Sequence, residues 1–189
     1  MAFLRLERLK LALWLLVIGS WGLGVIIGRW WSVNEFVIEL SKVVQVVSPL
    51  QLGAWWHPIV FMILSVVGVF VLSQVFLGVG ASVFLFARGM YDSTLIMQLE
   101  GTIGGWTLTN VPMSEVWIVS MLVLILAVNL PLCLWSGQLG AQRGVYVFYR
   151  LRGKTVDPDF GSKPFSKFLL ILTASIAVGV VGAIIFSYA

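Results

Sequence analysis

Long apolar runs separated by short polar segments dominate the pattern of this chain. The most extended run is Pro58 to Ala87, which contains no charged side chain. An α-helix rises about 1.5 Å per residue and a bilayer hydrocarbon core is about 30 Å thick, so about 20 residues cross it. The run is longer than one crossing needs. It therefore predicts either one long helix or a chain that breaks and re-enters near Ser73-Gln74 or Gly78-Val79-Gly80.

Three further apolar runs, at 11–28, 116–135 and 165–188, are each long enough to cross a membrane. The first follows a basic N-terminal stretch, but no small-x-small cleavage site comes after it and bulky Arg29-Trp30-Trp31 ends it. We therefore expect an uncleaved first transmembrane helix whose N-terminus is cytoplasmic.

A different pattern occupies residues 34–47, where apolar residues recur at helical spacing and charged residues gather on the opposite face. This pattern predicts an interfacial amphipathic helix, too short and too polar to cross. Aromatic residues flank this segment at positions typical of an interfacial belt. For His57, a hydrogen-bonded interfacial histidine is favoured over a proton carrier or ligand. These interfacial residues are Trp30, Trp31, Trp55, Trp56 and His57.

Basic residues orient the predicted segments. No lysine or arginine lies between Gly89 and Gln142, which predicts that 90–115 is outside, and the basic loop 141–164 is predicted to be cytoplasmic. In the outside segment, Asp92, Glu100 and Glu115 could form a cation site, but solvated loop carboxylates are favoured.

Together these patterns predict an all-α integral membrane protein, a single transmembrane domain of about five membrane segments. Whether the third segment crosses fully or is partial or re-entrant stays open, and so does the alternative of four crossings with both termini inside. With five segments the C-terminus is outside. The expected segments are 11–28, 58–78, 79–99, 116–136 and 165–188.

Glycines at helical spacing predict close helix packing, either within the fold or with a partner. The candidate packing residues are Gly24, Gly28, Gly78, Gly80, Gly140, Gly144, Gly179 and Gly182. Asn129 lies two residues before Pro131 inside an apolar run, and an amide there must find a partner. Interhelical hydrogen bonding is favoured for it, while a candidate intramembrane polar site would combine Asn129 with Gln74 and Ser73.

Composition excludes several classes of protein. The chain is 60% hydrophobic and 11% charged, with a mean hydropathy of +1.02, which excludes an ordinary soluble domain. A net charge of +4, spread over helix ends, does not favour nucleic-acid binding. One cysteine and one histidine allow no intrachain disulfide and no ordinary zinc site, and we expect no cofactor. We find no nucleophile–base pair, HExxH or phosphate loop, so an enzyme is not expected.

Two stretches resemble a known family. The glycine-punctuated FLGVGASVFLFARGMYDSTLI (76–96) is similar to the central segment of the stage II sporulation protein M family. Ser114-Glu115-Val116, followed by SGQLGAQRG (136–144), is similar to a later family motif in which a glutamate precedes an apolar helix and a glycine-rich turn. The resemblance spans 58–144. This chain departs from the family in having Arg88-Gly89 where Asn-Gly is common, and in lacking a His-Gly before the glutamate.

The resemblance implies a non-enzymatic membrane anchor that, in sporulating bacteria, recruits cell-wall-degrading partners. From the residues we likewise expect a plasma-membrane scaffold or accessory subunit that positions partner proteins. Its expected partners are membrane lipid and other membrane subunits or further copies of itself, not nucleic acid. The alternative is a small channel or transporter subunit with a site near the broken central helix and Asn129–Pro131.

Overall fold

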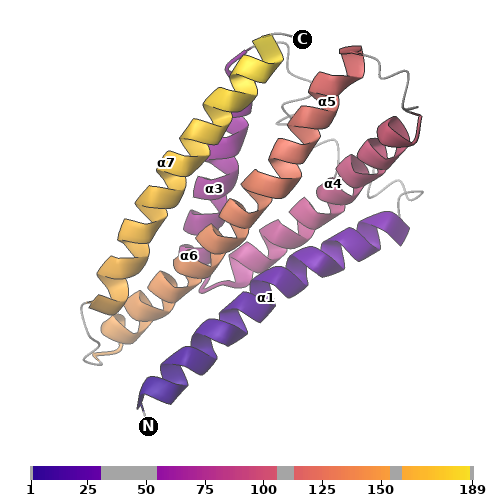
Figure 1. Ribbon diagram of the computed structural model, residues 1–189. Coiled ribbons are helices and arrows are strands. Elements are labelled where there is room, and N and C mark those ends of the chain that lie inside the picture. Colours follow the sequence, from indigo (N-terminus) through magenta and orange to yellow (C-terminus); the bar gives the residue numbers. More distant parts are fainter. Residues whose placement is uncertain (1, 31–54, 106–112, 154–158, 188–189) are drawn as a thin grey trace.

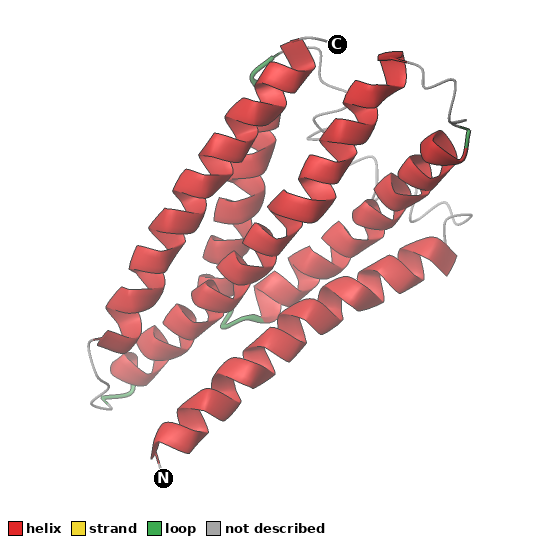
Figure 2. Cartoon of the chain, in the orientation of Figure 1, coloured by secondary structure: helices red, strands yellow, loops and turns green. Residues whose placement is uncertain are grey.

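The computed structural model describes residues 2–30, 55–105, 113–153 and 159–187, and every regular element in these ranges is a helix (Figures 1 and 2). The predicted interfacial helix 34–47 and Trp31 lie outside the described residues. The helices are α1 (Ala2–Trp30), α3 (His57–Val75), α4 (Val79–Gly104), α5 (Met113–Val123), the π-helical turn η1 (Leu124–Asn129), α6 (Leu130–Leu151) and α7 (Asp159–Ser187).

Successive helices run in opposite directions along the bundle, and α5, η1 and α6 form one continuous rod (Figure 1). The N-terminus, the last turn of α6 and the first turn of α7 lie at one end of the bundle. The C-terminus and the start of α3 lie at the other end. We call the first of these the basic end, because it carries Arg150, Arg152 and Lys163.

Four helical stretches are long and apolar enough to cross a membrane: Leu11–Trp30, His57–Val75, Glu115–Leu151 and Lys163–Ser187. The chain is therefore all-helical in its described part, with the composition of a multi-pass membrane protein. Helix α4 has 26 residues and is longer than three of these stretches, but it is more polar, since it carries Arg88, Asp92 and Glu100. It nevertheless packs along α1 for much of its length (Figure 1).

The helix bounds differ from the expected segments in two places. The expected segment 79–99, left open as partial or re-entrant, is part of α4, a continuous helix that runs on to Gly104, where loop carboxylates were predicted. The predicted glycine-rich turn 136–144, and the first part of the predicted basic loop 141–164, belong to α6 instead. In both places the helix continues through polar residues and glycines that contact other helices, such as Asp92 and Gly140.

The long central run breaks at Phe76–Gly78, between α3 and α4. Leu77 and Gly78 both have positive φ, 51° and 94°, a region that strains most side chains but not glycine. The Gly78 N–H donates to the Ser73 carbonyl at 2.8 Å and closes the turn. One of the two predicted break sites is therefore observed, and it produces a tight turn between two full helices.

Helices α1 and α4 approach each other through glycines. A Cβ added at Gly24 would collide with the Phe86 carbonyl oxygen, and one at Gly89 would collide with the Trp21 carbonyl oxygen. One added at Gly28 would lie 2.9 Å from Met90 Cα. Without side chains at these positions the two backbones come into direct contact, as in the small-residue interfaces of membrane helices.

Helix α3 is packed between α6 and α7 through the remaining glycine pairs. Added Cβ atoms at Gly140 and Gly144 would lie 2.5 and 2.7 Å from the carbonyl oxygens of Phe70 and Gln74 on α3. On α7, Gly179 lies against Ile59, Gly182 lies against Pro58, and an added Cβ at Gly179 would lie 2.8 Å from Ile59 Cα. Gly80 contacts the Leu72 carbonyl across the α3–α4 turn. All these glycines therefore pack within the chain.

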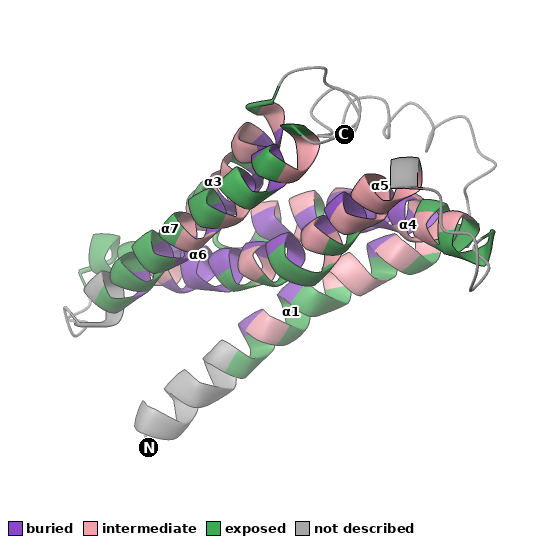
Figure 3. Ribbon diagram, turned by 45° about the horizontal axis from the view of Figure 1, so that its top comes forward, coloured by how far each residue is buried: buried purple, intermediate pink, exposed green. Residues whose placement is uncertain are grey.

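Apolar residues also cover the outside of the bundle, where α1 and α7 turn broad exposed faces outward (Figure 3). Leu15 and Leu23 on α1 and Leu170 on α7 are 65%, 57% and 71% exposed. Buried side chains instead line the interior between α3, α4 and α6. Apolar surface on the outside is expected of a protein surrounded by lipid.

We predict that Gly24→Ile lowers the free energy of unfolding by about 3 kcal/mol or more, because the new side chain must push α1 away from the α4 backbone. Gly19→Ile is the matched control on the same helix, since no atom lies within 4 Å of a Cβ there. SDS titration in mixed micelles, followed by circular dichroism, measures both. Equal losses in the two variants would contradict the glycine contact.

Candidate functional site

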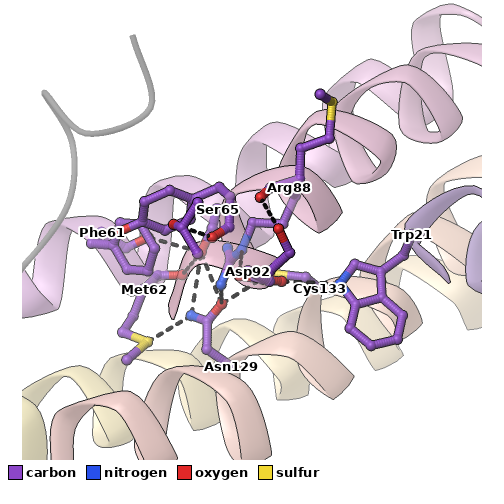
Figure 4. A network of polar contacts seen from close by, with 12 residues as sticks. Trp21, Phe61, Met62, Ser65, Arg88, Asp92, Asn129 and Cys133 are labelled. Carbon is purple, nitrogen blue, oxygen red and sulfur yellow. Dashed lines mark hydrogen bonds and ion pairs between the residues drawn. The ribbon is translucent and has the colours of Figure 1, made fainter. Parts of the chain in front are cut away.

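A buried ion pair lies at the centre of the bundle (Figure 4). Arg88 Nε donates to Asp92 Oδ1 at 2.9 Å, and the two side chains are only 3% and 0% exposed. They stand four residues apart on α4, the spacing at which helical side chains meet. A single charge in this position would be strongly destabilising, so the neutral pair is the form that such an interior tolerates.

Helix α1 joins the ion pair through Trp21, whose indole Nε1 donates to Asp92 Oδ2 at 3.0 Å. Asp92 therefore accepts a bond at each carboxylate oxygen, one from its own helix and one from α1. The Trp21 carbonyl lies beside Gly89, on the turn between Arg88 and Asp92. The glycine contact thus brings α1 near enough for this hydrogen bond.

The Arg88 guanidinium reaches two further helices. Its Nη2 donates to Asn129 Oδ1 at 3.3 Å, at the junction of η1 and α6. Its central carbon lies 5.1 Å from the ring centroid of Phe61 on α3, within the range of a cation–π contact. One arginine therefore contacts α3, α4 and the long α5–α6 rod.

The Asn129 side chain completes the network. Its Oδ1 accepts from Arg88 and from Cys133 Sγ, the latter at 3.1 Å, and its Nδ2 donates to Ser65 Oγ at 3.2 Å and to Met62 Sδ. The single Ser65 hydroxyl proton goes to the Phe61 carbonyl at 2.8 Å. No buried side-chain nitrogen or oxygen in the described ranges lacks a hydrogen-bond partner. We call this set of residues the polar network: Trp21, Phe61, Met62, Ser65, Arg88, Asp92, Asn129 and Cys133.

The π-helical turn η1 places Asn129. It spans Leu124–Asn129, and the Leu130 N–H bonds to the Ile125 carbonyl five residues back instead of four. Pro131 follows directly, and a proline has no N–H to give to the carbonyl of Ala127 and would press its ring against it in a regular α-helix. A widened turn relieves this clash, which explains why it occurs here.

The structure divides the candidate polar site of Asn129, Gln74 and Ser73. Asn129 is fully buried in the polar network, where it hydrogen-bonds four residues of α3, α4 and α6. Ser73 Oγ donates to the Gly137 carbonyl at 2.7 Å, and the Gln74 backbone lies against Gly144. Ser73 stands eight residues beyond Ser65, about 12 Å along α3. These three residues therefore do not form one site.

The candidate interfacial residues that the structure describes lie at the end of the bundle opposite the basic end. Trp30 closes α1 and is 86% exposed. Trp55 and Trp56 precede α3 and are exposed, and the Trp56 ring lies 4.0 Å, centroid to centroid, from that of His57. The described residues contain no cluster of three or more His, Cys, Asp or Glu side chains that could hold a metal ion.

Asp92 and Glu100 were predicted to be solvated loop carboxylates, and for Asp92 this was wrong. Asp92 is buried in the ion pair, while Glu100, on the last turns of α4, pairs at 3.2 Å with Arg29 of α1 and is 53% exposed. The signal for the buried pair was present in the sequence as Arg88 and Asp92 at i, i+4 spacing. The roles of Trp21, Ser65, Met62 and Cys133 had no such signal, because they depend on which helices are neighbours.

The polar groups of the network bond mainly to one another. The charge of Arg88 is neutralised by Asp92, and the buried polar atoms are hydrogen-bonded.

No protein-family model, curated protein or solved structure matches this chain.

We predict that Arg88→Met and Asp92→Leu, made singly, each lower the free energy of unfolding by about 3–5 kcal/mol, because each leaves an unpaired buried charge. The double variant should regain part of this loss, since apolar residues replace the pair, although the Trp21 N–H then lacks its acceptor, which costs about 1–3 kcal/mol. SDS titration of the three variants forms a double-mutant cycle.

Arg29→Gln is the matched control, because it removes an exposed pair that also joins α1 and α4. In the parent chain the Arg29 side chain is 58% exposed, so we expect Arg29→Gln to lower the free energy of unfolding by about 0–1 kcal/mol. If the single variants at Arg88 and Asp92 cost no more than this control, the buried pair is not what holds the helices together.

Proposed function

We propose that this chain is a non-enzymatic scaffold or accessory subunit of a membrane complex, a rigid helical platform on which partner proteins are positioned. The observation that carries the proposal is the saturation of the polar network: within the described residues, its buried polar groups are paired with one another across four helices. Such a network fixes the relative positions of helices and leaves no buried group waiting for a substrate.

The outer surface supports the same proposal. The candidate glycines are occupied by contacts within the chain, so partners would dock on the exposed apolar faces of α1 and α7 or at the ends of the bundle. These faces are compatible with lipid and with other membrane helices alike. The scaffold role implied by the resemblance to the stage II sporulation protein M family agrees with a platform of this kind.

We further propose that the bundle crosses the plasma membrane five times, with α4 as the third crossing in chain order, added to the four apolar stretches, and that the basic end is cytoplasmic. The helix directions support this count, because the N-terminus and the basic end of α6 and α7 lie together and the C-terminus lies opposite (Figure 1). Lysine and arginine are enriched on the cytoplasmic side of membrane proteins. The polarity of α4 is compatible with a crossing because its charges at 88 and 92 neutralise each other inside the bundle.

The scaffold proposal predicts that gentle purification of the tagged full chain in mild detergent yields a stoichiometric set of other membrane proteins, identified by mass spectrometry. The Arg88→Met/Asp92→Leu double variant should retain the same set, because it keeps the packing and alters no outer surface. Recovery of the chain alone from its native membrane would contradict the proposal.

A second candidate is a channel or transporter subunit, and one observation favours it. The π-helical turn and Pro131 lie beside a buried ion pair, and both π-helical turns and ionisable residues inside membranes are common at functional sites. In this case the polar network would open to admit a substrate.

The transport alternative predicts substrate-dependent flux in proteoliposomes that contain this chain alone, with flux lost in Asn129→Leu and in the double variant. Unchanged partner capture together with absent flux would favour the scaffold. If the chain binds no other protein and shows flux that requires Asn129, the transport function would replace the scaffold proposal.

A further inference from the structure

Two buried glutamines on α6 differ from the other polar groups of the interior. Gln138 and Gln142 stand four residues apart and are only 4% and 7% exposed. Neither amide has a hydrogen-bond partner among the described residues, whereas every other buried polar side chain in these ranges has one. Every fully buried nitrogen and oxygen atom there has a partner, so the atoms of these two amides lie in the small part of each residue that stays accessible.

The contacts of α6 indicate which helix covers the two glutamines. Gly140 lies against α3, Gly137 lies against side chains of α4, and Arg143 lies over a ring of α7. At about 100° per residue, Gln138 and Gln142 stand about 160° and 200° round the axis from Gly140, on the face opposite α3. Helix α1 also packs on α6 and is the neighbour left for this face. The glutamines therefore lie at the contact between α1 and α6.

This part of α1 supplies no bond to either amide. A Cβ added at Gly78 would lie 3.3 Å from Ala141 Cβ and 3.9 Å from the Leu13 side chain, so this part of α6 lies at the level of the first apolar turns of α1. Residues 11–19 of α1 carry a single polar side-chain atom, the Trp14 indole nitrogen, and it does not bond to the glutamines. An amide without a partner is strongly unfavourable in an apolar interior. The partner must therefore come from outside the described side chains.

Water has the size and the chemistry for this position. Side chains four residues apart on a helix have Cβ atoms about 5–6 Å apart, and two hydrogen bonds of about 2.9 Å through one oxygen span the same distance. Each amide offers both donors and an acceptor, and a buried water typically makes about three hydrogen bonds. A larger ligand would have to displace the side chains that cover the glutamines. We propose that Gln138 and Gln142 form a binding site for a bridging water molecule at the α1–α6 contact.

The basic end is the nearer source of this water. Helix α6 ends at Leu151, about 13 Å along the axis beyond Gln142, whereas the start of α5 at Met113 is about 40 Å away in the other direction. The site also makes the two contacts of α1 different. Glycines join its backbone directly to α4, but a water molecule joins the groups at its contact with α6.

The site is tested by NMR on the full chain in lipid nanodiscs, with ¹⁵N in the side-chain amides of glutamine and asparagine. Magnetisation transferred from water to each NH₂ group is measured, and the signals of the site are assigned by their loss in Gln138→Met and Gln142→Met. We expect transfer to both amides to be at least about tenfold faster than to Asn129, since a bound water contacts the amides directly. Asn129 is the internal control, because it is fully buried and bonded to protein groups. Transfer no faster than to Asn129 overturns the proposal.

Stability gives a second measurement that needs no assignment. If a water satisfies the amides, Gln138→Leu and Gln142→Leu each lower the SDS concentration at the unfolding midpoint, and the double variant lowers it no further, because either change removes the bridge. Gln98→Leu, at an exposed position of α4, is the control for added apolar surface. A rise of the midpoint above that of this control would show that the amides are dry. Additive losses would show that they do not share a water.

A lipid group is the remaining occupant to exclude. Repeating the NMR measurement with protonated and with deuterated lipid separates the two sources, and we expect the same transfer from water in both. Transfer that comes from lipid protons instead of water would overturn the proposal. None of these outcomes depends on which proteins copurify with the chain, so the scaffold proposal is tested separately.

Discussion

A positive and a negative charge buried in an apolar bundle must satisfy each other and then satisfy all their remaining hydrogen-bonding groups. Arg88 and Asp92 meet this demand by drawing on every neighbouring helix. Asp92 requires Trp21 from α1, and Arg88 requires Asn129 from the α5–α6 rod and the face of the Phe61 ring from α3. Because an unpaired charge there would cost several kcal/mol, a misplaced helix is penalised far more than it would be by apolar contacts alone.

The glycine contacts and the polar network depend on each other. Trp21 reaches Asp92 because Gly24 and Gly89 let the α1 and α4 backbones touch, and a Cβ at Gly24 would lie 3.1 Å from Gly89 Cα. On the other side of the bundle, α6 and α7 lie close to α3 through Gly140 and Gly179. The serines Ser136 and Ser175 then each donate at 2.8 Å to a carbonyl of α3. Backbones that approach this closely make short polar side chains effective links between helices.

The apolar runs predicted helices over most of α1, α3 and α7 and over the α5–α6 rod as far as residue 136, because a membrane-sized hydrophobic run is a local property of the sequence. The polar part of the fold was less predictable. Gly140 and Gly144 were singled out for helix packing from their spacing, but that they form, with Gly137, the face on which α6 meets α3 is revealed only by the neighbouring helix. Arg88 and Asp92 looked like the edge of a loop because charge was counted residue by residue, without their pairing. Asn129 was correctly singled out as a polar residue beside Pro131, but its partners on α3 and α4 come from helix neighbours that no local pattern encodes.

The three-residue turn Phe76–Gly78 has a consequence for how the chain enters a membrane during its synthesis. Helices α3 and α4 are consecutive in the chain, so in the proposed five-crossing arrangement the most polar helix would follow an apolar one into the membrane. By then Trp21, Phe61 and Ser65 have already been made, and Arg88 and Asp92 neutralise each other within a single helical turn. Asn129 is the last partner to be synthesised. If the proposed five crossings form, this order of residues would let the charged pair leave water as a neutral unit and gain its final contact only when the α5–α6 rod is in place.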